Sequence, residues 1–388
     1  MRNLRQNNQT LRITCVIGSL GGGGAERVMV NLSTALSELG HIVHLLTTEK
    51  DTPDCYNTPE SVTRHRLPDG AKTSCRWFDI QCQHHRSKTL RNAIIQLRPD
   101  LVISFLDTVN ISVLLALRGT GIPTIVAEHI DPRHHSIGWR WAMLRKFTYP
   151  WASAVTVLTD SVKAWAMKAW PCTKVYTIPN AISLPEITES TGFPAYFGKC
   201  NLIAMGRLTR QKGFDLLLTA FSNLASRLPD WHLTILGEGD DRPMLEHAIE
   251  QIGLRERIHL PGRVSEPTIV ISHGDLVVLS SRYEGFGMAL AEAMAIGLPV
   301  VSFDCPSGPS DIIRNNIDGV LVPPGDIGAL TSALARLMED ESLRKELANH
   351  APDILERFSQ DRVIALWQSL IEEVMSASTF SESNPKGI

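Results

Sequence analysis

The chain has 388 residues, of which 43% are hydrophobic and 20% are charged. This length suits two α/β domains of roughly 150 residues each, and the composition excludes a disordered or collagen-like chain. A formal net charge of -3 gives no overall field that would attract nucleic acid, so no nucleic-acid partner is expected. The seven cysteines are scattered singly, without the spacing of a zinc site, which predicts reduced thiols and a cytoplasmic protein.

The sequence gives no sign of a secretory or membrane-spanning segment. The first ten residues are polar and carry no apolar stretch followed by a cleavage site. Nor does any apolar run reach the roughly 18 residues that a membrane-spanning helix needs. Membrane contact, if it occurs, is therefore expected to be peripheral, on the inner face of the cytoplasmic membrane.

Short apolar runs alternate with segments of helical periodicity through the first half of the chain. This alternation is typical of βαβ units that form a parallel sheet. The predicted strands are Leu11–Ile17, Ile42–Thr47, Leu101–Phe105, Thr124–Ala127, Ala154–Leu158 and Val175–Ile178. The first Rossmann-like domain is thus placed at residues 1–183.

A stretch rich in proline, serine and threonine predicts a linker at 184–199. The alternation then starts again, which predicts a second Rossmann-like domain at 200–352. Its predicted strands are Asn201–Met205, Leu233–Leu236, Ile258–Leu260, Leu276–Leu279, Val300–Phe303 and Gly319–Val322. An apolar stripe that includes Trp367 predicts a terminal helix within 353–375, crossing back to the first domain. The polar tail 376–388 is expected to be disordered.

Four consecutive glycines, Gly21 to Gly24, follow the first predicted strand and precede a helix. Such a loop lets the backbone approach a ligand closely, so Gly23 and Gly24 are candidate donor contacts. The spacing is not that of a dinucleotide fingerprint, so a nicotinamide cofactor is not favoured. The alternative is a flexible turn between strand and helix.

Two cations follow the first strand of the second predicted domain. Arg207 and Lys212 would lie at the carboxyl edge of a parallel sheet, where ligands of such folds bind. An arginine fork and a nearby lysine suit a diphosphate, whose charge is shared over several oxygens. Taken alone, the pair also fits a solvated surface cluster.

A glycine-rich turn between Glu284 and Glu292 follows the strand at Leu276–Leu279. The amides at the start of the next helix would bind phosphate, helped by the helix dipole. Glu284 would then accept hydrogen bonds from sugar hydroxyls, and Glu292 from ribose hydroxyls. Each glutamate alone fits a solvated or capping carboxylate equally well.

The segments GGGGAERV, GRLTRQKG, LGEGDDRPML and EGFGMALAEAMAIGLPVV resemble the retaining glycosyltransferases of family 4. These have the GT-B fold, two Rossmann-like domains with a cleft between them. Glu284 and Glu292, eight positions apart, are similar to the E-x7-E motif of that family. The resemblance implies transfer of a hexose or N-acetylhexosamine from a nucleotide sugar in polysaccharide or glycoconjugate assembly. The segment from Phe303 to Pro309 resembles relatives with UDP-linked donors.

The resemblance also implies roles for single residues. Arg207 and Lys212 would hold the donor diphosphate, and Glu284 would contact the transferred sugar. His129 would lie near the reacting sugar, although a lone histidine is also often structural. No metal ion is expected, because the chain has no D-x-D motif, and no cofactor other than the donor. The predicted donor contacts are Gly23, Gly24, Gly206, Gly237, Glu238, Arg263, Val264, Phe286, Gly287, Met288, Ala289, Leu290 and Glu292.

The segment from Arg133 to Trp151 interleaves basic and large apolar residues. Tryptophan favours the lipid headgroup layer, and cations favour anionic lipid or pyrophosphate. Arg133, Arg140 and Arg145 are therefore predicted to bind an acceptor linked to polyprenyl diphosphate. Since Trp139 and Trp141 cannot share one helical face, at least one should pack inward. The alternative is a partly buried helix with a solvated basic face.

Two other functions remain open from the residues alone. The two glutamates could form the acid and nucleophile pair of a glycosidase, in which case their carboxyl groups would lie about 5 Å apart. The chain could also bind a nucleotide sugar without turning it over and serve as a scaffold for other glycan enzymes.

Overall fold

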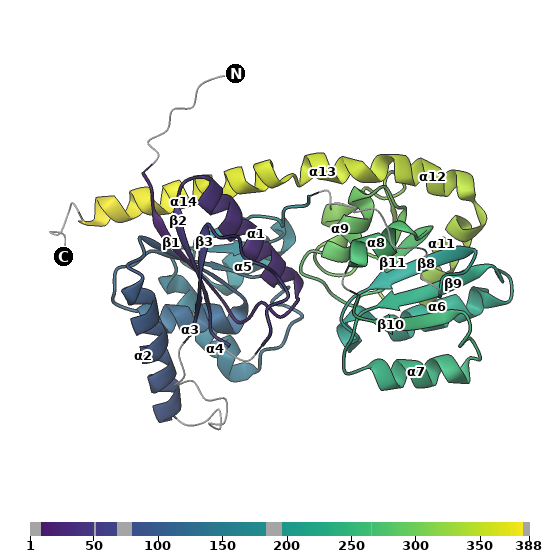
Figure 1. Cartoon of the computed structure of the whole chain (residues 1–388), viewed down its shortest axis with the longest axis horizontal. Helices are drawn as coiled ribbons and strands as arrows, with labels where there is room; N and C mark the ends of the chain where they lie inside the picture. The colour runs from purple at the N-terminus through teal and green to yellow at the C-terminus, as the bar shows by residue number, and fades with distance from the viewer. Residues whose placement is uncertain (1–8, 50–51, 68–79, 184–195, 265, 383–388) are drawn as a thin grey trace, which may run out of the picture. The chain divides into compact units, whose positions relative to one another are not determined.

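The computed structural model describes residues 9–49, 52–67, 80–183, 196–264 and 266–382 (Figure 1). The chain divides into two compact units. The amino-terminal unit is Met1–Ile178 with Ile364–Ile388, and the carboxyl-terminal unit is Pro179–Val363. Each unit is a parallel sheet covered by helices, as the sequence predicted. Most of the predicted linker, 184–195, lies outside the described residues.

The amino-terminal sheet has the strand order β3-β2-β1-β4-β5-β6-β7, and every pair is parallel. The sequence missed β3, because its residues VTRHR contain no apolar run. An edge strand pairs on one side only and tolerates such polar residues. The strands are β1 (Arg12–Ile17), β2 (Ile42–Thr47), β3 (Val62–Arg66), β4 (Leu101–Phe105), β5 (Thr124–Ala127), β6 (Ala154–Val157) and β7 (Val175–Thr177).

Helices cover both faces of this sheet. On one face, α2, α3 and α5 pack on alternate strand residues such as Val16, Val102 and Val126. On the other face lie α1 and α14 (Figure 1). This alternation follows from the two-residue period of a strand. The helices are α1 (Gly24–Glu38), α2 (Ile80–Gln96), α3 (Asp107–Leu117), α4 (Trp139–Thr148), η1 (Tyr149–Trp151), α5 (Asp160–Ala169) and α14 (Gln360–Glu382).

The terminal helix α14 packs on the amino-terminal sheet. The ring of Trp367 stacks on Phe105 of β4, with centroids 6.2 Å apart, so the predicted contact is confirmed. The tail prediction was wrong for residues 376–382, which continue α14 as seven further helical residues. The segment 375–382 holds no glycine or proline, and each residue added to an existing helix gains one backbone hydrogen bond. Residues 383–388 lie outside the described part.

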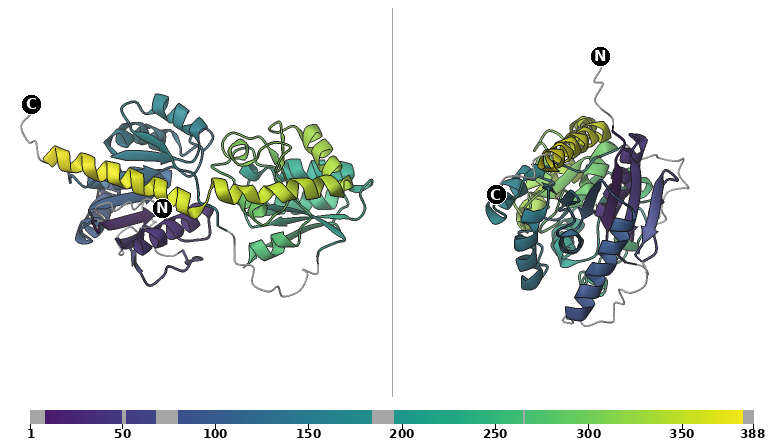
Figure 2. Two further views of the ribbon diagram at one scale, coloured as in Figure 1. Left: turned by 90° about the horizontal axis from the view of Figure 1, so that it is seen from above. Right: turned by 90° about the vertical axis from the view of Figure 1, so that its left-hand side faces the viewer.

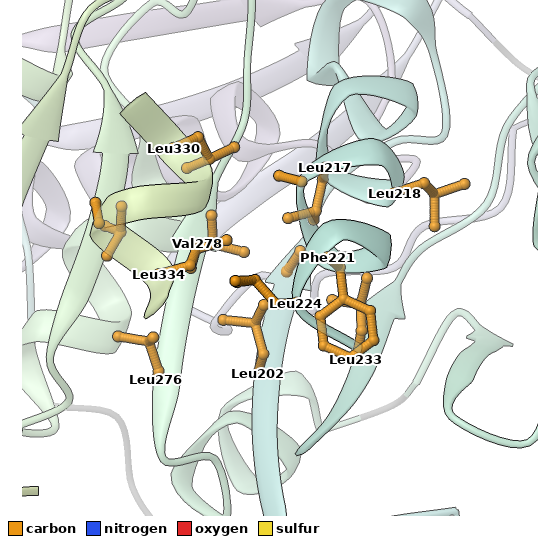
Figure 3. Packing of buried hydrophobic residues seen from close by; sticks show 14 of the residues in the cluster. Leu202, Leu217, Leu218, Phe221, Leu224, Leu233, Leu276, Val278, Leu330 and Leu334 are labelled. Carbon is orange, nitrogen blue, oxygen red and sulfur yellow. The ribbon is translucent and has the colours of Figure 1, made fainter. Parts of the chain in front are cut away.

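The carboxyl-terminal sheet has the order β10-β9-β8-β11-β12-β13 and is also parallel throughout. Its largest core cluster lies between the sheet and α6, α7 and α11, where Leu202, Phe221 and Leu334 interdigitate (Figure 3). The strands are β8 (Cys200–Met205), β9 (Trp231–Leu236), β10 (Ile258–Gly262), β11 (Leu276–Leu279), β12 (Val300–Phe303) and β13 (Val320–Val322).

The opposite face of the second sheet is covered by α9, with α8 packed beside it (Figure 1), and Figure 2 gives two further views of the chain. The helices of this unit are η2 (Arg210–Lys212), α6 (Phe214–Ala225), α7 (Arg242–Gln251), α8 (Pro267–Ser272), α9 (Met288–Ala295), α10 (Pro309–Ile312), α11 (Ile327–Glu339), α12 (Glu341–His350), η3 (Ala351–Asp353) and α13 (Ile354–Arg357).

Both sheets contain a topological switch point. In the second sheet the chain first adds β9 and β10 beside β8, and then returns to add β11 on the other side of β8. The helices that follow β8 and β11, α6 and α9, therefore cover opposite faces of the sheet. Ligands of open α/β sheets bind outside the carboxyl ends of the strands at this point.

Candidate active site

The loops after β8 and β11 are held together at the switch point of the carboxyl-terminal unit. Gly213 has a positive φ of 63°, and a Cβ there would lie 2.1 Å from the carbonyl oxygen of Ser280. The Ser280 hydroxyl donates to the carbonyl oxygen of Lys212 at 2.9 Å. Only glycine permits this close approach of the two backbones.

Lys212 and Glu284 form an ion pair at this point. The Lys212 Nζ donates to Glu284 Oε1 at 2.6 Å, and the Glu284 side chain is buried. The Ser281 hydroxyl donates to the same oxygen at 2.5 Å. Lys212 also lies across Gly206, since a Cβ there would be 2.9 Å from Lys212 Cε. The structure thus brings a predicted phosphate-binding cation next to the carboxylate predicted to contact sugar.

A second set of contacts, on either side of the Lys212–Glu284 pair in sequence, also joins the loops after β8 and β11. Arg282 donates two hydrogen bonds to the carboxylate of Asp215, at 2.8 and 2.6 Å. The pKa of Asp215 is lowered, mainly by these hydrogen bonds from Arg282. Gln211 Nε2 donates to the carbonyl oxygen of Tyr283 at 3.0 Å. These contacts limit the movement of Lys212 and Glu284 before any ligand binds, which is the preorganisation that electrostatic catalysis requires.

The turn before α9 is built around glycines. Gly287 caps α9 with a φ of 96°, which suits glycine. A Cβ on Gly308 would lie 2.2 Å from the carbonyl oxygen of Phe286, so the loop after β12 presses on this turn. Helix α9 opens with the predicted phosphate-binding backbone, and the first amides of a helix have no carbonyl partner from a preceding turn. The Leu290 amide instead donates to the carbonyl oxygen of Gly287 at 3.0 Å. Glu292, one turn further, is buried. The remaining residues of this backbone are Met288, Ala289 and Leu290.

The loop after β12 lies directly against Glu284. The Glu284 amide donates to the carbonyl oxygen of Pro306 at 3.4 Å. The pKa of the Cys305 thiol is raised to about 12, first by burial and then by the negative charge of Glu284. The segment that resembled relatives with UDP-linked donors is therefore next to the carboxylate predicted to contact the sugar.

The loops after β9 and β10 carry the predicted nucleobase contacts. Glu238 is held by two hydrogen bonds of 3.0 Å from Arg242. Gly237 has a φ of 137°, and a Cβ there would lie 2.0 Å from the carbonyl oxygen of Gly206. Arg263 is exposed at the end of β10, followed by the half-buried Val264. Arg207 is also exposed and forms no ion pair within the part of the chain that the structure describes.

His129 follows β5 in the amino-terminal unit. Its ring packs against Phe105, with centroids 4.1 Å apart. Both ring nitrogens are buried and lack a hydrogen-bond partner among the described residues. Burial lowers the pKa of His129 to about 3, so the imidazole is neutral at pH 7. Buried polar atoms normally have partners, so these two nitrogens are suited to a bound ligand.

The predicted glycine loop opens α1 in the amino-terminal unit. Gly23 is the N-cap residue and Gly24 the first residue of the helix. The Tyr56 hydroxyl donates to the carbonyl oxygen of Gly23 at 3.1 Å. The loop is thus at the end of β1, beside the switch point of the first sheet, and in the unit that holds His129.

The three predicted acceptor-binding arginines lie in different surroundings. Arg133 forms an ion pair of 2.7 Å with the buried Asp131. Arg145 is itself buried and lies 3.5 Å from the carboxylate of Glu128, so the prediction of an accessible Arg145 was wrong. A fully buried guanidinium must be paired, and periodicity alone does not reveal which side of a helix a cation takes. Arg140 is exposed.

Some residues of the site were not found from the sequence. Ser281 and Gln211 position Glu284 and its loop, yet a serine and a glutamine beside a strand are common on any surface.

Among the residues that the structure describes, no three His, Cys, Asp or Glu side chains are grouped so as to hold a metal ion. Within the same residues, no helix is both long and apolar enough to cross a membrane.

Two Rossmann-like units in tandem, each a parallel sheet covered by helices, are the architecture of the GT-B class of glycosyltransferases. The family model "Glycosyltransferase Family 4" matches residues 22–185, and the model "Glycosyl transferases group 1" matches residues 196–353. The chain belongs to the GT-B glycosyltransferases of the family 4 type. It is a glycosyltransferase.

Similar proteins cover nearly the whole chain. The "GalNAc-alpha-(1->4)-GalNAc-alpha-(1->3)-diNAcBac-PP-undecaprenol alpha-1,4-N-acetyl-D-galactosaminyltransferase" of Campylobacter jejuni is 29% identical over 95% of this chain and 100% of its own length. The amylovoran biosynthesis glycosyltransferase AmsD of Erwinia amylovora is 27% identical over 91% of this chain and 97% of its own. The structure of HepE from Anabaena, in complex with UDP and glucose, superposes with a TM-score of 0.76 at 17% identity, covering 93% and 99% of the two chains.

Proposed function

We propose that the carboxyl-terminal unit binds a UDP-sugar and that the enzyme transfers its hexose or N-acetylhexosamine with retention of anomeric configuration. The proposed acceptor is a glycan linked to polyprenyl diphosphate, presented at the inner face of the cytoplasmic membrane. No metal ion takes part in the proposed reaction. The observation that carries this proposal is the ion pair between Lys212 and Glu284 at the switch point of the second sheet.

The proposed donor site divides the ligand between neighbouring groups. Lys212 and Arg207 would bind the diphosphate, together with the first amides of α9. Glu284, adjacent to Lys212, would accept hydrogen bonds from the transferred sugar. Glu292, one turn along α9, would accept hydrogen bonds from the ribose. This arrangement needs no bound cation, since protein cations and amides neutralise the charge of the departing diphosphate.

Retention is proposed to proceed by attack on the face from which the diphosphate departs. The carboxylate of Glu284 already accepts hydrogen bonds from Lys212 and Ser281. Such contacts lower the nucleophilicity of a carboxylate, which disfavours a covalent glycosyl-enzyme and a glycosidase pair. Positive charge at the diphosphate would instead stabilise the transition state, and removing one such group typically costs a factor of about 10² to 10³ in kcat.

His129 is proposed to contact the reacting sugar from the amino-terminal unit. Its imidazole is neutral at pH 7, because burial lowers its pKa to about 3. A neutral imidazole offers one donor and one acceptor, which suits sugar hydroxyls. Gly23 and Gly24, at the start of α1, are proposed to let backbone approach the ligand.

The proposed substrates draw support from named relatives. The name of the Campylobacter jejuni relative includes a diphospho-undecaprenol acceptor, and the HepE structure is a complex with UDP. The exposed Arg140 is a candidate contact for the acceptor pyrophosphate. Arg145 is not, because it is buried against Glu128, and Arg133 pairs with Asp131.

The proposal is tested with purified full-length enzyme and a panel of UDP-sugars, GDP-sugars and ADP-sugars. Each donor is offered to undecaprenyl-diphosphate glycans, and nucleotide release, product mass and the anomeric configuration of the new bond are measured. We expect UDP release, an α-linked product from an α-linked donor, and full rates in excess EDTA. Inversion, or loss of activity in EDTA restored by Mg²⁺, would contradict the mechanism. UDP-sugar binding without turnover on any acceptor would favour a scaffold.

A further inference from the structure

Helix α4 presents an apolar stripe to solvent. Trp139 is 70% exposed, Met143 50%, Phe147 61% and Trp151 of the adjoining η1 40%. These four residues, named the α4 stripe, recur every fourth position, so they share one side of the helix. Scattered exposed apolar residues are normal on a soluble protein, whereas a contiguous group marks an interaction surface.

The inner side of α4 is fixed to the amino-terminal core, so the stripe cannot turn inward. Arg145 pairs with Glu128, and Tyr149, just after the helix, donates a hydrogen bond from its hydroxyl to the same carboxyl group. Trp141 packs on the cluster around Tyr149, which confirms that one of the two tryptophans lies inward. The α4 stripe can therefore be buried only by a partner that is not among the described residues of this chain.

The surroundings of the α4 stripe are positively charged. No Asp or Glu occurs between residues 132 and 159. Arg140 and Lys146 are exposed on α4 itself, and the Arg118 guanidinium lies 4.3 Å from the ring centroid of Trp151. A second copy of the chain in two-fold symmetry would place these cations against one another, so self-association is disfavoured. Anionic lipid complements both the charge and the apolar surface.

We propose that the α4 stripe inserts into the headgroup layer of an anionic bilayer, with Arg118 and Lys146 beside lipid phosphates. Tryptophan rings favour this layer, and an amphipathic helix with a basic border lies in its plane. This inference rests on the proposed lipid-linked acceptor, because a bilayer is where such an acceptor is held. It assigns membrane contact to the stripe and its bordering cations, and not to Arg133 or Arg145.

The test is sedimentation of full-length protein with mixed vesicles of phosphatidylcholine and phosphatidylglycerol, because phosphatidylglycerol supplies the anionic headgroups. Wild type is compared with Trp139→Ser/Phe147→Ser and with Arg118→Glu/Lys146→Glu. The matched control is Met244→Ser/Ile317→Ser, since both residues are exposed apolar side chains of the carboxyl-terminal unit. We expect at least a tenfold loss of vesicle binding in both α4-side variants, none in the control, and weaker binding of wild type in pure phosphatidylcholine.

Equal vesicle binding by all four proteins, or no binding by wild type, would overturn the inference. So would a wild-type dimer in light scattering that Trp139→Ser/Phe147→Ser dissociates, because the stripe would then be a protein interface. UDP release with a water-soluble acceptor analogue should be unchanged in the stripe variant, which also shows that it is folded. Failure of every donor with wild type would refute the proposed function while leaving vesicle binding as a separate result.

Discussion

Replacing the buried Glu128 by glutamine should change how the stability of the amino-terminal unit depends on pH. Burial raises the pKa of this carboxyl from 4.5 to about 7, and the neighbouring Arg145 opposes the shift. The folded protein therefore binds this proton more tightly than the unfolded chain. The resulting stabilisation is fully present below pH 4.5 and is lost as pH rises through 7. A difference of about 2.5 pKa units, at 1.36 kcal/mol each, gives a change of about 3 kcal/mol.

Histidines act in the opposite direction and must be separated from this effect. Burial lowers the pKa of six of them, so the free energy of unfolding falls as pH drops below about 6.5, their unfolded value. Both proteins share these groups, so they cancel when the Glu128→Gln variant is subtracted from wild type. The six are His41, His44, His65, His129, His232 and His259.

The assay is urea unfolding at pH 5, 6, 7 and 8, followed by tryptophan fluorescence. All tryptophans except Trp231 belong to the amino-terminal unit, so the signal reports mainly on that unit. The wild-type free energy of unfolding minus that of Glu128→Gln should fall by about 2.5 kcal/mol between pH 5 and 8. The remainder of the change lies below pH 5, where the unfolded carboxyl titrates. A difference that stays constant with pH would refute the buried, protonatable carboxyl. Glu372→Gln, an exposed change on α14, is the matched control for net charge.

Three further substitutions test separate parts of the structure. Ser281→Ala removes a hydrogen-bond donor to Glu284 and should lower kcat about tenfold, measured by UDP release, with little change in UDP affinity, measured by calorimetry. An unchanged kcat would argue against a positioning role for Ser281. Gly308→Ala places a Cβ 2.2 Å from the carbonyl oxygen of Phe286, so it should weaken UDP binding more than tenfold. Normal UDP binding would show that the loop after β12 adjusts to the added Cβ. Trp367→Ala should lower the free energy of unfolding of the amino-terminal unit by about 3 to 5 kcal/mol, measured by urea unfolding, without altering UDP affinity. If the variant instead destabilised the carboxyl-terminal unit, so that this unit unfolded first, the packing of α14 would be contradicted.

Much of the fold is predictable from the sequence because buried parallel strands leave a direct signal. β2, β4, β5, β11 and β12 match the predicted bounds, since each is a short apolar run that ends at a polar or glycine-rich turn. The edge strand β3 has no such run, and its pairing with β2 is decided by contacts that lie far apart in sequence. The extension of α14 was missed because a polar helix has no apolar period to detect.

The site was predictable where residue type and topology act together. Arg207, Lys212 and Glu284 follow strand ends, and parallel strands bring such ends to one edge. Contacts made across the fold left no sequence signal. Ser281 was missed for this reason, and Arg145 was assigned to solvent although the buried Glu128, seventeen positions earlier, pairs with it.

The central claim is that Lys212 at the switch point stabilises the departing diphosphate of a nucleotide sugar. The most direct measurement is the rate of UDP release under saturating donor and acceptor for wild type, Lys212→Ala and the control Lys199→Ala, whose exposed side chain pairs with Asp230 in the same unit. We expect a loss of about 10² to 10³-fold in kcat for Lys212→Ala and a wild-type rate for Lys199→Ala. A Lys212→Ala enzyme that is folded and releases UDP at the wild-type rate would contradict it.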